Sequence, residues 1–149
     1  MRLIFLDFDG VLHPLEPESL GLEKFCWLPV LTSLLSGHDD VQIVVHSTWR
    51  YEYTNPELRA LLGPLGMRFA GSAPRAPREQ AIETVLQANR AIQHHLVLDD
   101  DAREFSGTAV NLLLLDSQRG ISDEQAQADV TAWLLSTATP EATAQGRDT

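Results

Sequence analysis

Cysteine and lysine are almost missing from this chain of 149 residues, which has only Cys26 and Lys24. A single cysteine excludes an internal disulfide and is typical of a reducing compartment, so we expect a cytoplasmic location. The sequence also lacks any apolar run near the roughly 20 residues of a membrane-spanning helix. We therefore expect no membrane partner. The first apolar strand starts at Arg2, which predicts that no signal peptide is present.

Positive charge is scarce as well. Eleven lysines and arginines stand against 21 aspartates and glutamates, for a net charge of −10. Affinity for nucleic acids or anionic membranes depends on basic surface that displaces counterions, so we expect no strong general binding to either. A phosphorylated substrate would need a local positive centre.

The length and a hydrophobic content of 44% fit one globular domain with a core. No repeat or linker divides the chain. We predict a single domain over residues 1–136. Small polar residues prevail after it, and we predict a flexible tail over residues 137–149.

Apolar, β-branched runs predict buried strands of a parallel sheet at residues 2–7, 41–47, 95–101 and 110–116, with a short strand at 66–71. Helices are predicted at about 23–36, 55–62, 76–90 and 122–135, and an irregular flap at 11–22. We expect Asn55 to cap the second helix and Ser122 with Gln125 to form a capping box for the last. Alternating strands and helices predict an α/β fold of three layers, Rossmann-like, with a central parallel sheet.

Polar side chains follow three of these strands: Asp7 with Asp9, Ser47 with Thr48, and the run 99–101. Ligands in parallel sheets bind at the carboxyl ends of the strands, so these groups should converge. Residues two apart on a strand point to one face, which would crowd Asp7 against Asp9. Two such charges about 4 Å apart repel by about 4 kcal/mol at an effective dielectric near 20. A metal ion or a shared proton is the usual way to offset this.

The segments "DFDGVL", "IVVHSTWR", a basic residue opening a helix, and "LVLDDD" follow one another in the order of a known set of motifs. They resemble the four motifs of the haloacid dehalogenase-like (HAD) phosphohydrolase superfamily, over roughly residues 2–116. The "STWR" and the short flap are similar to small HAD domains without a cap, including those within multi-domain RNA-repair proteins. Only 37 residues run from Gly10 to His46, and 30 lie between Ser47 and Arg78. We therefore expect a minimal cap or none, and an open site.

The resemblance implies that Asp7 is the nucleophile, forming an aspartyl-phosphate. Asp9 would protonate the leaving oxygen and then activate water. Gly10 would let the chain turn sharply so that both carboxylates face outward, and it is expected among the residues that bind the phosphate or substrate. Ser47 would donate to a phosphoryl oxygen, and Thr48 could do the same if the strand ended one residue later.

The third motif needs a cation, and Lys24 lies outside the segment that must supply it. We choose Arg78, with Arg75 as the alternative. Arg78 lies at a helix N-terminus, where the macrodipole disfavours a cation unless an anion is present. A bound phosphate is such an anion.

The acidic run is expected to help hold Mg²⁺, which prefers carboxylate oxygens. We expect Asp7 and Asp100 as ligands with Asp99 as close support, and the resemblance adds the backbone carbonyl of Asp9. Asp101 is expected to face solvent or cap the next turn.

Two histidines, a tryptophan and an arginine also lie in or near these motifs. His13, in the flap, could touch the substrate, and Arg50 is either a substrate contact or a salt-bridge partner. Trp49 is interpreted as packing. His46 lies inside a strand and is interpreted as a core residue or a group behind the site.

The sequence therefore predicts a Mg²⁺-dependent phosphohydrolase acting on a phosphorylated macromolecule or another accessible phosphomonoester. Two alternatives are a catalytically idle HAD-like binding module and a receiver-like phospho-acceptor domain. The receiver normally needs a lysine at a late strand end, and none follows Lys24. A carbon–halogen hydrolase needs neither an acid at the position of Asp9 nor an acidic metal site, so the presence of both argues against that activity.

Overall fold

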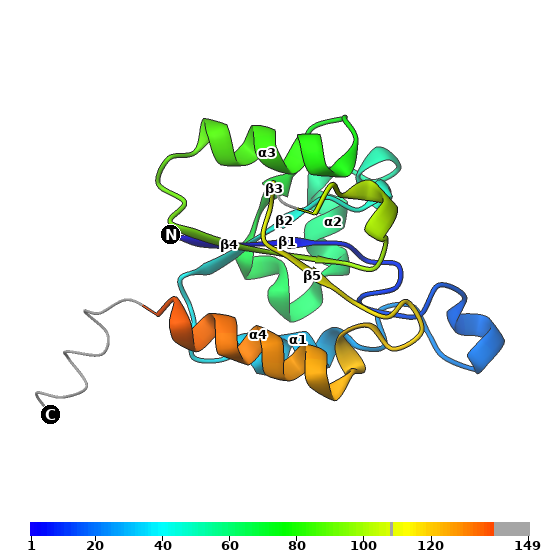
Figure 1. The fold of residues 1–149 in the computed structure, drawn as a ribbon. Coiled ribbons are helices and arrows are strands. Elements are labelled where there is room, and N and C mark those ends of the chain that lie inside the picture. The colour runs from blue at the N-terminus through cyan, green and yellow to red at the C-terminus, as the bar shows by residue number, and fades with distance from the viewer. Residues whose placement is uncertain (108, 139–149) are drawn as a thin grey trace, which may run out of the picture.

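Five parallel strands form one central sheet in this structure, a computed structural model that describes residues 1–107 and 109–138. The strands are β1 (Arg2–Leu6), β2 (Val41–Val45), β3 (Phe69–Ser72), β4 (His94–Asp99) and β5 (Leu112–Leu114). Their order across the sheet is β3-β2-β1-β4-β5, and β1 is central (Figure 1). The predicted α/β class with a central parallel sheet is confirmed. The predicted tail lies outside the described residues from residue 139 onward.

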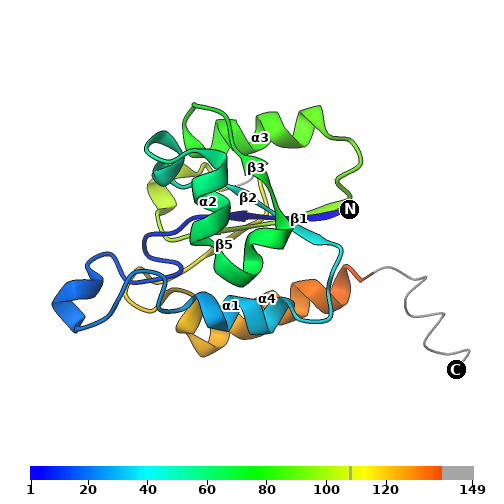
Figure 2. The same cartoon turned by 180° about the vertical axis from the view of Figure 1, so that it is seen from behind.

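Helices cover both faces of the sheet. They are α1 (Leu28–Leu35), α2 (Asn55–Leu61), α3 (Arg78–Ala88) and α4 (Glu124–Ser136). Helix α3 lies over one face, and α1 and α4 lie together over the other, as the views from both sides show (Figures 1 and 2). The predicted arrangement in three layers is confirmed. Within the described ranges, no helix combines the length and the apolar character that crossing a membrane would require.

The alternation of side chains along β1 divides the core in two. Ile4 and Leu6 are buried in the cluster that contains side chains of α1, α2 and α4. Leu3 and Phe5 are buried on the opposite face, with residues of α3. Each fully buried side chain of this size contributes about 1.5–3 kcal/mol. This packing on both faces holds the carboxyl end of β1 in a fixed position.

The first helix begins later than predicted. Phe25 has a left-handed backbone conformation (φ +63°), which an α-helix does not allow, and α1 starts only at Leu28. The segment 63–68 forms a 3₁₀ turn with Pro64 near its start, so the short strand predicted from residue 66 begins at Phe69.

Both predicted helix caps are wrong by one residue. Thr54 caps α2: its side chain accepts from the Glu57 N–H while the Glu57 carboxylate accepts from the Thr54 N–H. Asn55 instead accepts a hydrogen bond from Ser72. Asp123, and not Ser122, caps α4 by accepting from the backbone of Ala126. Neighbouring cap-type residues compete at each helix start, and the local backbone decides which of them faces the free N–H groups.

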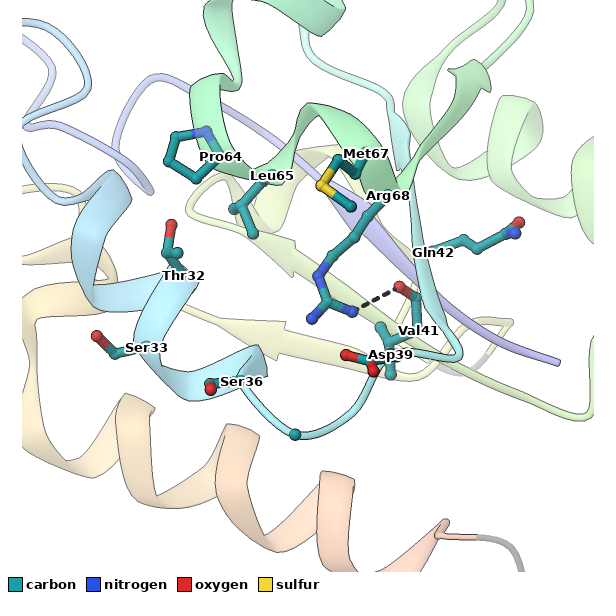
Figure 3. Close-up of a pocket in the computed structure, with 11 residues that line it drawn as sticks. Thr32, Ser33, Ser36, Asp39, Val41, Gln42, Pro64, Leu65, Met67 and Arg68 are labelled. Atoms are coloured by element: carbon teal, nitrogen blue, oxygen red, sulfur yellow. Dashed lines mark hydrogen bonds between the residues drawn. The ribbon is translucent and has the colours of Figure 1, made fainter.

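A hollow of about 850 Å³ lies at the amino-terminal end of the sheet, between the end of α1, the start of β2 and the 63–68 turn (Figure 3). Arg68, the cation in its wall, donates to the carbonyls of Leu35, His38 and Val41. Those contacts occupy the guanidinium in holding the end of α1 and the start of β2. The polar groups expected to carry chemistry lie at the other end.

Candidate active site

The carboxyl ends of β1 and β4 meet the first turn of α3. Asp7 follows β1, Asp99 ends β4, and Arg78 is the first residue of α3. A hollow of about 340 Å³ opens there, and its walls include Asp7, Asp9, Arg78 and Asp100. Chain segments more than 70 residues apart thus bring the predicted acids and the predicted cation together, because parallel strands end at one edge of the sheet.

Arg78 bridges two buried acids with one nitrogen. Its Nη1 lies 3.2 Å from Asp7 Oδ2 and 3.0 and 2.9 Å from the two oxygens of Asp99. Burial opposes the charge on this guanidinium, but the two carboxylates outweigh burial and raise the pKa of Arg78. Among the described residues, no oxygen accepts a hydrogen bond from its Nη2. That nitrogen can therefore donate to an anion beside Asp7.

Asp99 accepts four hydrogen-bond contacts, although its side chain is 0% exposed. Besides the two from Arg78, His46 Nε2 lies 2.7 Å from Oδ2 and the Asp101 N–H lies 2.9 Å from Oδ1. Burial works against ionisation, but the hydrogen bond from His46 and the charge of Arg78 lower the pKa of Asp99. A carboxylate has about four lone-pair sites. The protein fills them, so Asp99 holds Arg78 more directly than it could hold a metal.

The pKa of Asp7 is shifted in the opposite direction from that of Asp99. Burial, then the charge of Asp99, and further the contact with Asp100 raise its pKa well above the usual range, although Arg78 acts in the other direction. Oxygens of Asp7, Asp99 and Asp100 lie within 4.8 Å of one another. Three carboxyl groups around one guanidinium leave an excess of negative charge. Hard oxygen donors in this number fit Mg²⁺, which keeps several waters and takes few protein ligands.

Gly10 makes room for this arrangement. Its φ of +78° is one that residues with a side chain rarely adopt, and a Cβ at this position would clash with the Asp100 carboxylate. The glycine therefore allows the turn and also leaves space for the Asp100 carboxylate.

The predicted crowding of Asp7 against Asp9 is not what the structure contains. β1 ends at Leu6, so the strand rule does not extend to the pair. The carboxylate of Asp9 instead accepts from His13 Nε2 at 2.8 Å and from Trp49 Nε1 at 2.9 Å. The His13 hydrogen bond, with that of Trp49, lowers the pKa of Asp9 against the effect of burial. The like charges that act on Asp7 are those of Asp99, which ends β4, and of Asp100, which follows it.

His13 is a buried link between Asp9 and the segment before α1. Its Nδ1 accepts from the Phe25 N–H at 3.0 Å, so a neutral His13 carries its proton on Nε2, facing Asp9. The ring is fully buried. This geometry gives His13 partners within the protein, and the substrate contact that the sequence allows for it stays a prediction.

In the segment after β2, the predicted site residues differ in their exposure and contacts. Ser47 is buried, and its Oγ accepts from the Trp49 N–H at 3.3 Å, which leaves the hydroxyl proton to donate. Thr48 is exposed. Arg50 donates to the carbonyls of His46, Ser47, Pro74 and Ala76 and so ties this segment to the one before α3. Those contacts occupy both its Nη atoms, and among the described residues Arg50 makes no salt bridge, one of the two roles expected from the sequence; the other, a substrate contact, stays a prediction.

The two candidates for the cation of the third motif are separated by the fold. Arg75 reaches the backbone carbonyl of Tyr51 at 3.4 Å, and its guanidinium lies 4.9 Å from the Tyr51 ring. Arg78 lies against Asp7. The structure thus brings one of the two to the acidic cluster.

A second hollow, of about 420 Å³, lies on the other side of Asp9, between the flap and the segment after β2. Trp49 and Tyr53 stack in its wall with centroids 5.3 Å apart, and Lys24 Nζ lies 5.5 Å from the centre of the Trp49 ring. Asp9 and Leu15 line both hollows. Asp9 therefore stands between the acidic cluster and a space with one aromatic wall.

Three contacts of the site were not predicted from the sequence: those of His13 and Trp49 with Asp9, and that of His46 with Asp99. The last two depend on which strand ends become neighbours, so no spacing indicates them. One sequence signal points to a buried contact of His46: it is a polar residue two positions after Val44, and so on the same face at the end of β2.

The family model for the HAD domain in Swiss Army Knife RNA repair proteins matches residues 3–126. The chain belongs to this family. The resemblance stated from the four motifs is thereby confirmed, and it places this HAD domain with the phosphohydrolase type of function in general terms. No curated protein and no solved structure matches the chain.

Proposed function

We propose that this HAD domain is a Mg²⁺-dependent phosphohydrolase that works through an aspartyl-phosphate. The observation that carries the proposal is the sharing of Arg78 Nη1 between Asp7 and Asp99, while Asp100 adds a third carboxyl group. Such a cluster holds too much negative charge for one guanidinium. A cation beside it would complete the charge balance and prepare the site for an anionic substrate.

Each step of the reaction has a residue on this chain. Arg78 Nη2 and the Ser47 hydroxyl would donate to the phosphoryl oxygens, which aligns the phosphorus with the Asp7 carboxylate. Asp7 forms the new P–O bond while the ester P–O bond breaks, and the leaving oxygen takes its proton from Asp9. Asp9 then removes a proton from water, whose oxygen attacks phosphorus. Inorganic phosphate leaves and Asp7 is regenerated.

Asp7, Asp100 and the Asp9 backbone carbonyl are the groups that would hold Mg²⁺. When bound, the ion would neutralise charge on the phosphoryl group. His13 and Trp49 serve Asp9: their hydrogen bonds fix the carboxylate and favour its base form, which the second step uses.

We propose a phosphomonoester on an accessible macromolecular end as the substrate, with a phosphorylated nucleic-acid end as the first to test. The family is named for RNA repair proteins. The stacked Trp49 and Tyr53 beside Asp9 offer an aromatic surface for the group that carries the phosphate, and bases stack on such surfaces. Residues 1–107 and 109–138 contain no folded cap that could close over a small metabolite. Its net charge of −10 predicts weak binding of the rest of a nucleic-acid strand.

The test is phosphate release from an aryl phosphate, a sugar phosphate, a nucleotide, a phosphopeptide and a 3′-phosphorylated oligonucleotide, with Mg²⁺ and with chelator. We expect turnover only with Mg²⁺, and a higher kcat/KM for the oligonucleotide than for the sugar phosphate. A clear preference for the sugar phosphate would contradict the open-site interpretation. The absence of turnover on every substrate would leave the idle binding module as the better interpretation.

Asp9→Asn separates hydrolase from phospho-acceptor. In a hydrolase, losing the acid and base costs roughly 10²–10⁴-fold and lets the phosphoenzyme persist. Intact-mass measurement after an acid quench detects it. A wild-type protein that accumulates the same stable adduct from acetyl phosphate, without releasing phosphate, would indicate the receiver-like alternative.

A further inference from the structure

We propose that His46 is a positioning residue for this reaction: it fixes Asp99, and through Asp99 it aims Arg78 at the phosphoryl group. The inference rests on the proposed function. His46 follows β2, Asp99 ends β4, and β1 lies between these two strands. The hydrogen bond from His46 Nε2 to Asp99 Oδ2 is 2.7 Å long. It therefore connects β2 with β4 past the end of β1, next to Asp7.

Burial of this pair is complete, since both side chains are 0% exposed. Nδ1 of His46 is also buried and has no hydrogen-bond partner among the described residues. A buried polar atom without a partner is rare and unfavourable. An apolar side chain would fill the same space beside the Phe105 ring without that cost. What the histidine alone supplies is the Nε2–H that faces Asp99.

The position of Asp99 decides which ring nitrogen of His46 donates. Burial lowers the pKa of His46, although the hydrogen bond to Asp99 acts in the opposite direction. A neutral ring has one N–H, and the Asp99 carboxylate next to Nε2 places that proton on Nε2. The contact is therefore a fixed donor to a carboxylate.

Asp99 passes this orientation on to Arg78. Its carboxylate receives donors from three directions: His46, the Asp101 N–H and Arg78. Arg78 Nη1 is shared between Asp99 and Asp7. If the His46 donor is lost, the Asp99 carboxylate can rotate and Arg78 can shift fully onto Asp7. The guanidinium would then mask the nucleophile and point Nη2 away from the phosphoryl oxygens.

Two amide variants test the role of His46, because they place the same N–H donor at two different distances from the backbone. In His46→Gln the amide nitrogen takes the place of Nε2, and in His46→Asn it takes the place of Nδ1. His46→Leu removes every donor and also removes the unpaired Nδ1. Outer groups that orient active-site ligands typically contribute 10–100-fold to activity or binding.

We expect kcat for an aryl phosphate to fall about 10–100-fold in His46→Leu and His46→Asn, with KM within about threefold. His46→Gln should stay within about threefold of the wild type. The melting temperature of His46→Leu should equal or exceed that of the wild type. Orthophosphate should raise the melting temperature of the wild type and of His46→Gln, and raise that of His46→Leu much less, because Arg78 is no longer aimed.

Three results would overturn the inference while leaving the phosphatase proposal intact: His46→Leu as active as the wild type, His46→Gln as inactive as His46→Asn, or losses that simply follow a lower melting temperature. A wild-type protein without turnover on any phosphomonoester would instead refute the proposed function, and the inference with it. If His46→Leu does not fold, the comparison of Gln with Asn still decides.

Discussion

At the amino-terminal end of the sheet, the buried arginine has partners for every donor, whereas at the carboxyl-terminal end the buried charges do not balance. Arg2, 3% exposed, donates to both Asp40 oxygens at 2.8 and 2.7 Å and to the Leu134 carbonyl at 2.8 Å. At the other end, Arg78 faces three carboxyl groups, and its Nε is a buried atom without a partner among the described residues.

The fold is stabilised at the amino-terminal end of the sheet, and stability is lower at the carboxyl-terminal end, where the candidate active site lies. A buried charge lowers the free energy of folding only when its hydrogen bonds are complete. Arg2 meets that condition and connects β1, α4 and the turn before β2. The charges in the cluster around Asp7 do not have complete partners within the protein. A cation together with a phosphoryl group would complete them. Unbalanced groups of this kind are typical of functional sites.

The largest expected effect comes from Asp7→Asn, which removes the nucleophile and one of the crowded charges. Turnover should fall by roughly 10⁴-fold or more. The metal-free protein should become more stable by about 1 kcal/mol, or roughly 2–4 °C in melting temperature, because the high pKa of Asp7 marks a carboxylate that is unfavourable when ionised. Phosphate release and thermal melting check both. Turnover like the wild type's would refute the assignment of Asp7.

Mg²⁺ should act on stability at the carboxyl-terminal end alone. An ion that binds only the folded chain stabilises it by about 2.7 kcal/mol at 100 times its Kd. The resulting rise in melting temperature should shrink in Asp100→Ala and remain in Asp40→Asn, the matched loss of a carboxylate at the other end. Melting with Mg²⁺ or chelator measures it. Equal shifts in the two variants would show that the ion binds elsewhere.

Arg2→Met tests the stabilising end. It keeps an aliphatic stem beside Trp133 and removes the hydrogen bonds to Asp40 and Leu134. We expect a loss of about 2 kcal/mol of unfolding free energy, with kcat/KM per folded molecule within about threefold of the wild type. Urea unfolding and the phosphatase assay measure the two quantities. A large loss of kcat/KM in the folded variant would mean that the ends of the sheet are coupled.

The smallest effect concerns pH. The hydrogen bond from Arg2 lowers the pKa of Asp40. Because the folded-state pKa lies below the unfolded value, this pairing stabilises the protein above the unfolded pKa, and the gain is lost as the pH falls through the folded pKa. Asp40 is 45% exposed, so the gain is within about 1 kcal/mol.

Asp40→Asn should therefore reduce stability at pH 7 and flatten its decline between pH 5 and pH 3, around the pKa of about 3.9 that an aspartate has in an unfolded chain. Urea unfolding at several pH values gives the comparison. Parallel curves for the variant and the wild type would rule out this linkage.

Much of the molecule follows from local pattern. The apolar runs predict the parallel strands, because strands buried on both faces need continuous hydrophobic sequence. The carboxyl edge of the sheet then collects Asp7 and the acidic run after β4, and the helix start at Arg78 lies beside them. Periodicity and strand order are enough for these features, since each depends on neighbours in sequence or on the general rule for parallel sheets.

The partners of individual side chains do not follow from pattern. Whether Asp9 crowds Asp7 or turns to His13 and Trp49 depends on where β1 ends and how the flap packs, and the strand rule gave the wrong answer. The sequence leaves Arg50 open between a substrate contact and a salt-bridge partner, and two of the four carbonyls that accept from it, those of Pro74 and Ala76, lie more than 20 residues away in the chain. Likewise, His46 meets Asp99 only because β2 and β4 flank β1. Hydrogen bonds between distant segments depend on angles and distances of a few tenths of an ångström, which the packed fold alone provides.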